Sequence, residues 1–320
     1  MITFFTTAKP FTGQACARQL NALRSWKKVD TEAEILLFGD GEGYDEAAEG
    51  LGLKRCCEVL QSQRGVPRID AMFKAVEQDG SFQLKTYVNA DIILLQDFLV
   101  ALKRIPFKEF LMVAQRTDVQ VDERDMVGEN WEAAMLSRLS KEGVLCDPTG
   151  IDFFAYRGSI WRDLPPLVVG RAGYDNYLIY YCRERRIPVV DASAMVKAIH
   201  QKHDYSHLVG GEREVWEGDD AKLNREMAGG NTRLFSIEDA DWRLTPSGLR
   251  RNWCRGDCRR AADVAKIIAR SRGGVIRWIP RQLLEAWYEL RSRCASAWDG
   301  SFRLLLKYPF WLGLHILRRR

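Results

Sequence analysis

A regular alternation of strand-like and helix-like segments over the first third of the chain constrains its fold most strongly. Short apolar runs at 2–8 and 34–40 are each followed by a stretch with apolar residues at helical spacing, at 12–26 and 44–51. Strands that alternate with helices form βαβ units, which build a parallel sheet with right-handed crossovers. The sequence therefore predicts an α/β fold, a mostly parallel sheet flanked by helices.

The alternation continues through the following segments. Further strands are predicted at 56–61, 86–95, 109–118, 149–157 and 187–193, and further helices at 67–78, 96–105 and 174–186. In an open parallel sheet, ligands bind outside the carboxyl ends of the strands. Polar side chains stand at the predicted ends of several runs, namely Thr6, Thr7, Asp40, Asn89, Asp91, Arg116 and Asp118. We therefore expect a ligand site at this edge of the sheet.

The segment Thr86–Leu95 is an apolar run interrupted by Asn89 and Asp91. A carboxylate at a strand end is a natural ligand for a hard divalent cation such as Mg²⁺ or Mn²⁺. An amide two residues earlier is able to hydrogen-bond a sugar or ribose hydroxyl. The alternative is that both residues merely end the strand and cap a turn.

Residues 1 to about 245 resemble glycosyltransferases of the GT-A type, close to the family-two-like nucleotide-diphospho-sugar transferases. The segments that carry the resemblance are ITFFTTAKPF, NALRSW, ILLFGD, GVPRIDAMFKAV, YVNADIIL, TGIDFFAYR, GRAGYDNYLIYYCR and IHQKHDYSH. That family has an Asp-x-Asp triplet that ends a central strand and binds a divalent metal with the donor's ribose and diphosphate. Here the triplet is Asn89-Ala90-Asp91, so the resemblance implies Asp91 as a ligand of Mn²⁺ or Mg²⁺ and Asn89 as a ribose contact. We expect Asn89→Asp to be tolerated and to tighten metal binding.

The same resemblance implies further contacts with the donor. It places the base beside Asp40, whose carboxylate is able to accept a hydrogen bond from a uracil or guanine N–H, and beside Thr6 and Thr7. Asp40 also precedes Gly41, which is the context of an ordinary turn aspartate. Arg68, before the strand of the triplet, is expected to reach the diphosphate.

Three of the four histidines lie within eight residues, at His200, His203 and His207. Imidazole binds borderline divalent metals, and spacings of three and four residues place such side chains on one helical face. The alternative is a polar surface loop. The resemblance implies that a histidine from this late position completes the metal shell, which favours His200 and then His203. Without a matching set of cysteines, structural zinc is not expected.

Transfer of a sugar with inversion needs a base that takes the proton of the acceptor hydroxyl. Asp175, which opens a predicted helix, matches the acceptor-side acidic residue of the family; an N-cap role is the alternative, and one residue can serve both. Asp152 is the competing candidate, either as the base or as a residue that positions the acceptor. Trp161 and Tyr174 are expected to contact the acceptor, since aromatic faces suit pyranose rings.

Charge divides the chain into two parts. Residues 241–320 hold 18 Lys and Arg against 6 Asp and Glu, and six of the ten Trp, whereas the rest holds 30 basic and 37 acidic residues. We predict a glycosyltransferase domain at 1–245 and a basic, Trp-rich helical tail at 246–320, with helix-like segments at 259–273, 278–298 and 302–320. Cations that frame Trp and Leu suit an anionic membrane surface, so 249–320 is expected to lie in its plane.

Two alternatives for the tail remain open. Its helices could pack on the domain or on a second subunit. Nucleic-acid binding fits the charge but leaves the density of apolar residues unexplained, so a nucleic acid is not the expected partner.

The remaining composition is typical of a soluble globular protein, with 46% apolar residues and a mean hydropathy of −0.28. Eight cysteines without a disulfide or zinc pattern, and no secretory signal, favour a cytoplasmic protein, peripheral at the inner face of the membrane. The leading prediction is a metal-assisted glycosyltransferase that moves a sugar from a nucleotide-diphospho-sugar to a saccharide or lipid-linked acceptor.

Two other functions compete with this one. A sugar-nucleotide nucleotidyltransferase shares the sheet, but it needs a glycine-rich phosphate loop after the first strand, and residues 6–13 do not form one. A catalytically degenerate GT-A scaffold tethered to the membrane is favoured only by Asn89 in place of aspartate.

Overall fold

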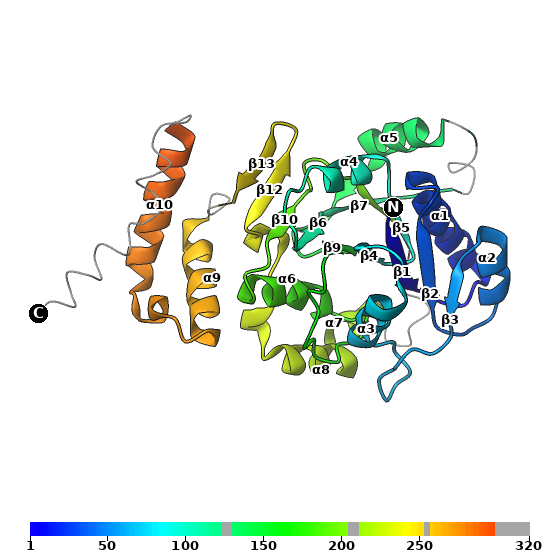
Figure 1. Ribbon diagram of the computed structural model, residues 1–320, viewed down its shortest axis with the longest axis horizontal. Coiled ribbons are helices and arrows are strands. Elements are labelled where there is room, and N and C mark those ends of the chain that lie inside the picture. The colour runs from blue at the N-terminus through cyan, green and yellow to red at the C-terminus, as the bar shows by residue number, and fades with distance from the viewer. Residues whose placement is uncertain (123–127, 129, 204–210, 253–256, 298–320) are drawn as a thin grey trace, which may run out of the picture. The chain divides into compact units, whose positions relative to one another are not determined.

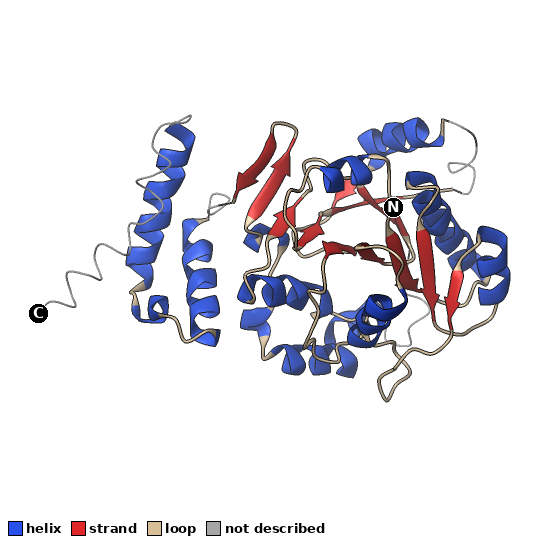
Figure 2. Ribbon diagram, viewed as in Figure 1, coloured by secondary structure: helices blue, strands red, loops and turns tan. Residues whose placement is uncertain are grey.

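The computed structural model of the chain describes residues 1–122, 128, 130–203, 211–252 and 257–297 (Figures 1 and 2). The chain divides into two compact units, residues 1–251 and 252–320. The sequence places this boundary at 245. In the structure the last strand of unit 1, Gly248–Arg251, pairs with the strand before it, so unit 1 extends through Arg251.

Unit 1 is built on a nine-stranded sheet with the order β13-β12-β10-β6-β9-β4-β1-β2-β3. Its strands are β1 (Thr3–Thr7), β2 (Glu34–Phe38), β3 (Lys54–Cys56), β4 (Leu84–Val88), β6 (Phe110–Val113), β9 (Phe153–Arg157), β10 (Val189–Asp191), β12 (Trp242–Thr245) and β13 (Gly248–Arg251). The neighbours from β3 to β4 and from β6 to β12 are parallel. Only β9, between β4 and β6, and the edge strand β13 run antiparallel. The predicted α/β class, with a mostly parallel sheet flanked by helices, is confirmed.

A second sheet of four short strands has the order β5-β11-β7-β8. These strands are β5 (Ile92–Ile93), β7 (Arg116–Val119), β8 (Val144–Leu145) and β11 (Ala198–Gln201). Two single strands predicted from the sequence, at 86–95 and 109–118, were wrong, because each is split between the two sheets. The Ile92 N–H donates to the Asn89 carbonyl, and this turn ends β4 and starts β5. The weak strand predicted at 56–61 lies earlier, at Lys54–Cys56.

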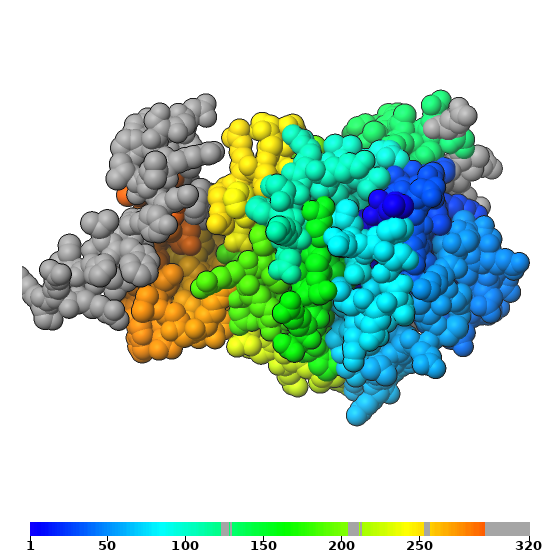
Figure 3. Space-filling view, viewed as in Figure 1, coloured from blue at the N-terminus to red at the C-terminus, as the bar shows by residue number. Residues whose placement is uncertain are grey.

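Helices cover both sides of the strands in unit 1 (Figure 2). They are α1 (Gly13–Val29), α2 (Tyr44–Leu51), α3 (Ile69–Asp79), α4 (Asp97–Lys103), α5 (Trp131–Glu142), α6 (Tyr174–Glu184), α7 (Gly211–Glu217) and α8 (Asp219–Ala228), with 3-10 turns at Asn231–Arg233 and Ile237–Asp239. The helices predicted from apolar spacing within 12–26, 44–51, 67–78, 96–105 and 174–186 are confirmed. In the space-filling view, cyan and green segments that are distant in sequence lie side by side on the surface of unit 1 (Figure 3).

Two neighbouring residues of β1 show how the sheet joins the helices. Successive side chains of a strand point to opposite faces. On one face Phe4 stacks on Trp26 of α1 and meets Phe98 of α4, with ring centroids 5.7 and 5.9 Å apart. On the other face Phe5 meets Phe73 of α3 at 5.3 Å. The sheet is therefore buried on both faces. A ligand can reach it only at the ends of its strands.

Unit 2 consists of α9 (Cys258–Ser271), a 3-10 turn η4 (Val275–Trp278) and α10 (Arg281–Ala297). The expected C-terminal helices at 259–273 and 278–298 are confirmed, and the third segment, 302–320, lies outside the described residues. In the part of the chain that the structure describes, no helix combines the length and the apolar character needed to span a bilayer.

Candidate active site

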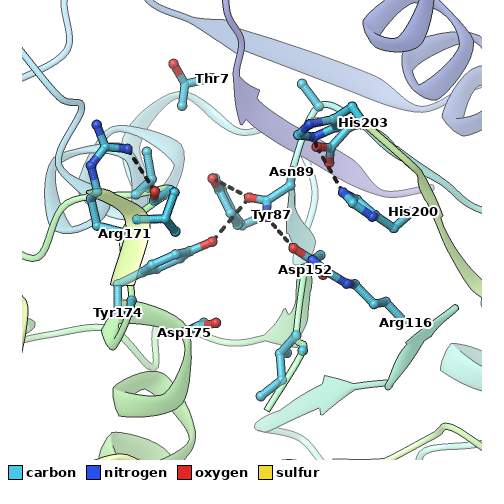
Figure 4. Close-up of a pocket in the computed structure, with 18 of the residues that line it drawn as sticks. Thr7, Tyr87, Asn89, Arg116, Asp152, Arg171, Tyr174, Asp175, His200 and His203 are labelled. Atoms are coloured by element: carbon cyan, nitrogen blue, oxygen red, sulfur yellow. Dashed lines mark hydrogen bonds and ion pairs between the residues drawn. The ribbon is translucent and has the colours of Figure 1, made fainter. Parts of the chain in front are cut away.

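A cavity of about 370 Å³ lies where the carboxyl ends of β1 and β4 meet the start of β9 and α6 and the end of β11. It brings together many of the residues expected from the sequence, namely Thr7, Asn89, Asp91, Asp152, Tyr174, Asp175, His200 and His203. Figure 4 shows Tyr174 and Asp175 on one side of the cavity, His200 and His203 on the other, and Asn89 between them. The predicted position of the site at the strand ends agrees with this cavity.

Asp91, His200 and His203 form one cluster. The Asp91 Oδ2 lies 3.1 Å from His203 Nε2 and 3.5 Å from His200 Nε2. His200 belongs to strand β11, which pairs with β5 just after Asp91, and His203 follows the end of that strand. The expected shared helical face was therefore wrong: the sheet pairing brings the two imidazoles together. His207 lies outside the described residues.

This cluster has the composition and geometry of a divalent-cation site. The three residues each offer one ligand atom, and these three atoms lie within 4.8 Å of one another. The Asp91 Oδ1 is buried and, among the described residues, has no hydrogen-bond partner. A buried carboxylate oxygen without a donor is costly unless a cation meets it. A carboxylate with two imidazoles suits a borderline cation such as Mn²⁺, whereas Mg²⁺ prefers oxygen ligands.

The electrostatics of the cluster are strongly coupled. Burial opposes the ionisation of Asp91, yet the charges and hydrogen bonds of His200 and His203 hold the pKa of this carboxyl well below its usual range. Burial also disfavours the imidazolium of His200, but Asp91 and Asp118 raise its pKa to about 10. Asp91 and Asp118 thus create a local negative potential, and the proton on His200 balances part of it. Because a histidine that binds a metal must be neutral, a cation bound here would displace those protons.

Arg116 and Asp118 extend the cluster, although the sequence analysis assigned them no role beyond their place at a strand end. The Asp118 Oδ1 lies 3.1 Å from His200 Nδ1, which leaves Nε2 of that ring facing Asp91. Arg116 joins Asp118 at 3.0 Å through Nε and Asp152 at 3.1 Å through Nη1. A carboxylate behind a histidine fixes its ring orientation and tautomer. Their spacing of two residues on β7, which puts both on one strand face, was the available signal.

Asn89 lines the cavity, and hydrogen bonds to three neighbouring side chains hold its amide in place. Its Oδ1 accepts hydrogen bonds from the hydroxyls of Tyr87 at 2.9 Å and Tyr174 at 3.2 Å. Its Nδ2 donates to the Asp152 Oδ1 at 2.7 Å. The two phenols occupy both lone pairs of the amide oxygen, and Asp152 takes one of the two amide hydrogens. Only the second amide hydrogen of Asn89 is therefore left to contact a ribose hydroxyl. The amide donates to Asp152 where an aspartate at this position would face it with a second carboxylate.

The contact with Asp152 reverses the expectation for Asn89→Asp. A second carboxylate would lie where Nδ2 now donates, and like charges at this distance raise the pKa of the pair. The folded pair then binds a proton that the unfolded chain releases, so stability is lost as pH rises. We expect a loss of about 1–3 kcal/mol at pH 8 and a smaller loss at pH 5. Chemical unfolding at both pH values measures it; Asn89→Ala is the uncharged control, and an equal loss at both pH values would contradict this account.

Asp175 lies in the first turn of α6, after Gly173, whose φ of 100° is left-handed. Its Oδ1 accepts from the backbone N–H of Asn176 at 2.9 Å, but the N-cap of α6 is Gly173 and has no side-chain capping bond, so the alternative N-cap role of Asp175 was wrong. Burial raises the pKa of this carboxyl to about 7, reinforced by the charge of Asp152 against the opposing effect of backbone N–H groups. Asp152 differs, because Arg116 and Asn89 engage both of its oxygens. Of the two candidates, Asp175 has the properties of a base that works near neutral pH.

Three of the expected donor contacts do not line the cavity. Thr6 is buried and its hydroxyl donates to the carbonyl of Thr7 at 3.1 Å. Asp40 has an exposed side chain, 3.5 Å from the guanidinium of Arg55. Arg68 makes two hydrogen bonds with Asp70, which lies two residues away, at 2.7 and 3.1 Å. Asp40 and Arg68 thus pair with opposite charges outside the cavity, and Thr6 is buried within strand β1.

Trp161 was expected beside the acceptor, but it is buried in the aromatic core. Its ring centroid lies 4.6 Å from that of Phe73 and 5.5 Å from that of Tyr181. The cavity is instead lined by Trp216 of α7, which is 51% exposed. The Ala172 N–H donates to the carbonyl of Val215 at 2.9 Å and holds α7 beside the start of α6. This contact joins segments more than forty residues apart, so no local pattern marks Trp216.

Scattered cations also line the cavity, namely Lys9, Arg18, Arg116 and Arg171. They come from separate segments of the chain, so the sequence shows no basic cluster. Together with the histidines they offer positive charge to a phosphate-bearing ligand.

No family model and no curated protein matches the chain. Among solved structures, S. aureus TarS 1–349 in complex with UDP is similar, with 16% identity over 38% of this chain and 37% of that chain, and a TM-score of 0.30. Glucosyl-3-phosphoglycerate synthase from Mycobacterium tuberculosis, in complex with Mn²⁺, UDP and phosphoglyceric acid, has 15% identity over 72% of this chain and 79% of that chain, and a TM-score of 0.41. The match thus spans little more than a third of the TarS 1–349 chain.

Proposed function

We propose that unit 1 is a glycosyltransferase that moves a sugar from a nucleotide-diphospho-sugar to an acceptor hydroxyl. One observation carries the proposal: the cluster of Asp91, His200 and His203 and the separate carboxyl of Asp175 open onto one cavity. The cluster suits a cation that meets a diphosphate. The carboxyl, with a pKa of about 7, suits the removal of a proton from a hydroxyl.

On the donor side, Asp91, His200 and His203 would hold a divalent cation, Mn²⁺ in preference to Mg²⁺. When bound, such a cation neutralises the negative charge that develops on the leaving diphosphate. Lys9 and Arg18 add positive charge along the same wall. Asp118 keeps His200 oriented toward the cation by accepting from its other nitrogen. Thr7 and the remaining amide hydrogen of Asn89 are the contacts proposed for the nucleoside and ribose.

On the acceptor side, Asp175 takes the proton of the attacking hydroxyl. The acceptor oxygen bonds to the anomeric carbon as the bond from that carbon to the diphosphate oxygen breaks, which is transfer with inversion. Tyr174 and Asp152 hold this wall in place through Asn89. Trp216 offers the exposed ring face that was expected of Trp161, and we propose that it stacks on the sugar of a saccharide or lipid-linked acceptor.

The two competing functions gain no support from the site. The degenerate scaffold drew on Asn89 alone, and the hydrogen bond from that amide to Asp152 gives the asparagine a structural reason. A buried carboxyl with a raised pKa is costly to keep in a scaffold that performs no chemistry.

For residues 249–320 we propose a peripheral contact with an anionic membrane, which would bring unit 1 to a lipid-linked acceptor. A cytoplasmic location at the inner face of the membrane belongs to the same proposal. The basic and apolar composition of the tail supports it.

Calorimetry with UDP-, GDP- and dTDP-sugars, each with and without Mn²⁺, tests the catalytic proposal. We expect one nucleotide class to bind, and Mn²⁺ to strengthen that binding by about tenfold or more, because a cation held by the cluster would neutralise charge on the diphosphate. Asp45→Ala, an exposed carboxylate outside the cavity, is the matched control for Asp91→Ala. Failure of every sugar nucleotide to bind in the presence of Mn²⁺ would refute the proposal. Release of pyrophosphate from a nucleoside triphosphate and a sugar phosphate would instead identify a nucleotidyltransferase.

A further inference from the structure

The connection between α9 and α10 carries an unusual charge pattern. Residues 264–284 contain five cations and no Asp or Glu, and the cations are Lys266, Arg270, Arg272, Arg277 and Arg281. Arg281 also lies 4.0 Å from Asp263, so its charge is partly balanced. We name residues 270–283 the basic turn. Its surface is positive and apolar together, a combination that a solvated loop does not need.

The backbone of the basic turn is well defined by hydrogen bonds. Gly273 has a φ of +69°, and its N–H donates to the carbonyl of Arg270. The next N–H, of Gly274, donates to the carbonyl of Ala269 at 2.8 Å. This pair of bonds is the Schellman arrangement, which stops α9. The 3-10 turn Val275–Trp278 follows at once, and its side chains therefore project from a short, fixed connection.

Four apolar side chains of the basic turn face solvent. The exposed fractions are 76% for Trp278, 62% for Leu283, 60% for Val275 and 37% for Ile276. The neighbouring helices bury other residues, including Val264, Ile268 and Leu284. The helical pair thus already has an apolar core, and the four side chains are additional to it.

From this surface we infer that the basic turn inserts into the headgroup region of an anionic membrane, with Trp278 at its tip. The inference rests on the membrane contact proposed above and assigns it to particular residues. The guanidinium of Arg277 lies 4.8 Å from the ring centroid of Trp278, so cation and indole face the same region. Indoles prefer the membrane interface, and arginines pair with lipid phosphates there.

Other occupants fit this surface less well. A second copy of the chain joined by a two-fold axis would set the basic turns against each other, and like charges would repel. A nucleic acid would satisfy the cations, but phosphate contacts leave Val275 and Leu283 without a partner. Anionic lipid satisfies both, because phosphates meet the cations and acyl chains meet the apolar side chains.

Flotation of the full-length protein with vesicles tests the inference. The vesicles contain phosphatidylcholine and phosphatidylglycerol at about two to one, and pure phosphatidylcholine is the neutral reference. We expect the parent protein to float with the anionic vesicles and to float less as salt is added. Trp278→Ser should lower the partition coefficient about tenfold, and Arg277→Gln about fivefold. Leu60→Ser, which removes an exposed apolar side chain from unit 1 outside the cavity, should leave it unchanged.

Three results would overturn the inference. If the parent floats and Trp278→Ser floats equally, the membrane contact stands but lies elsewhere in 249–320. If the parent does not float at low salt, the membrane contact itself fails, while donor binding measured by calorimetry remains a separate test of the transferase. If light scattering shows a dimer that Trp278→Ser dissociates, without flotation of either protein, the basic turn is an interface between copies of the chain.

Discussion

Asp175→Asn is expected to lower turnover by about a hundredfold or more while donor affinity stays near that of the parent. The amide keeps the shape of the side chain and an oxygen for the N–H of Asn176, but it accepts no proton from the acceptor. The metal cluster lies on the other side of the cavity and is not altered (Figure 4). Steady-state kinetics give the turnover, and calorimetry with the donor gives the affinity.

The pH dependence follows from the pKa of about 7 that burial gives Asp175. The ionised form is the base, so the activity of the parent should fall as pH falls through 7, and the variant should lack this acidic limb. Stability changes in the opposite direction. The folded carboxyl holds a proton that the unfolded chain releases near pH 4, so the parent loses stability as pH rises from 4 to 7. Asp175→Asn should therefore unfold at a higher temperature than the parent at pH 8.

Two companion variants separate the base from residues that only position the acceptor. Asp152→Asn and Trp216→Ala should mainly raise the apparent acceptor constant, because these side chains touch the wall or the sugar and take no proton. An inactive Asp152→Asn beside an active but less stable Asp175→Asn would reverse the assignment. Asp175 would then only stabilise the first turn of α6, and the base would be Asp152, next to β9.

Asp91→Ala is expected to abolish transfer and to weaken Mn²⁺ binding on the order of a hundredfold or more. The variant removes the carboxylate that contacts both His200 and His203 and leaves their two rings beside each other, with ring centroids 5.2 Å apart. Electron paramagnetic resonance of free Mn²⁺ measures the affinity without any turnover. Donor binding should also lose its dependence on the metal.

The matched control is Asp147→Ala. Asp147 also lines the cavity, but its carboxylate serves the backbone N–H of Thr149, and it stands outside the cluster. Its variant should bind Mn²⁺ as the parent does. Undiminished turnover in Asp91→Ala, or equal losses of Mn²⁺ binding in both variants, would remove the metal from this position.

Features that depend on neighbouring residues were determined by the sequence. Apolar residues at every second position indicate strands, and apolar residues at every third or fourth position indicate helices. Both patterns are visible within a few neighbouring residues. The same local logic places Asp91 at a strand end and Asp175 at a helix start. It also predicts the helices of the tail, and the exposed Trp278 comes from a turn that its own glycines close.

The tertiary structure alone decided which side chains meet. Asn89 looked like an altered metal triplet until its amide was found against Asp152, 63 residues away. His200 and His203 looked like residues of one helix, yet the pairing of β11 with β5 unites them with Asp91. Trp161, expected at the acceptor, is buried in the core, and Trp216, for which the sequence predicted nothing, lines the cavity. Burial and partnership depend on which distant segments the sheet brings together, and no periodicity within one segment contains that information.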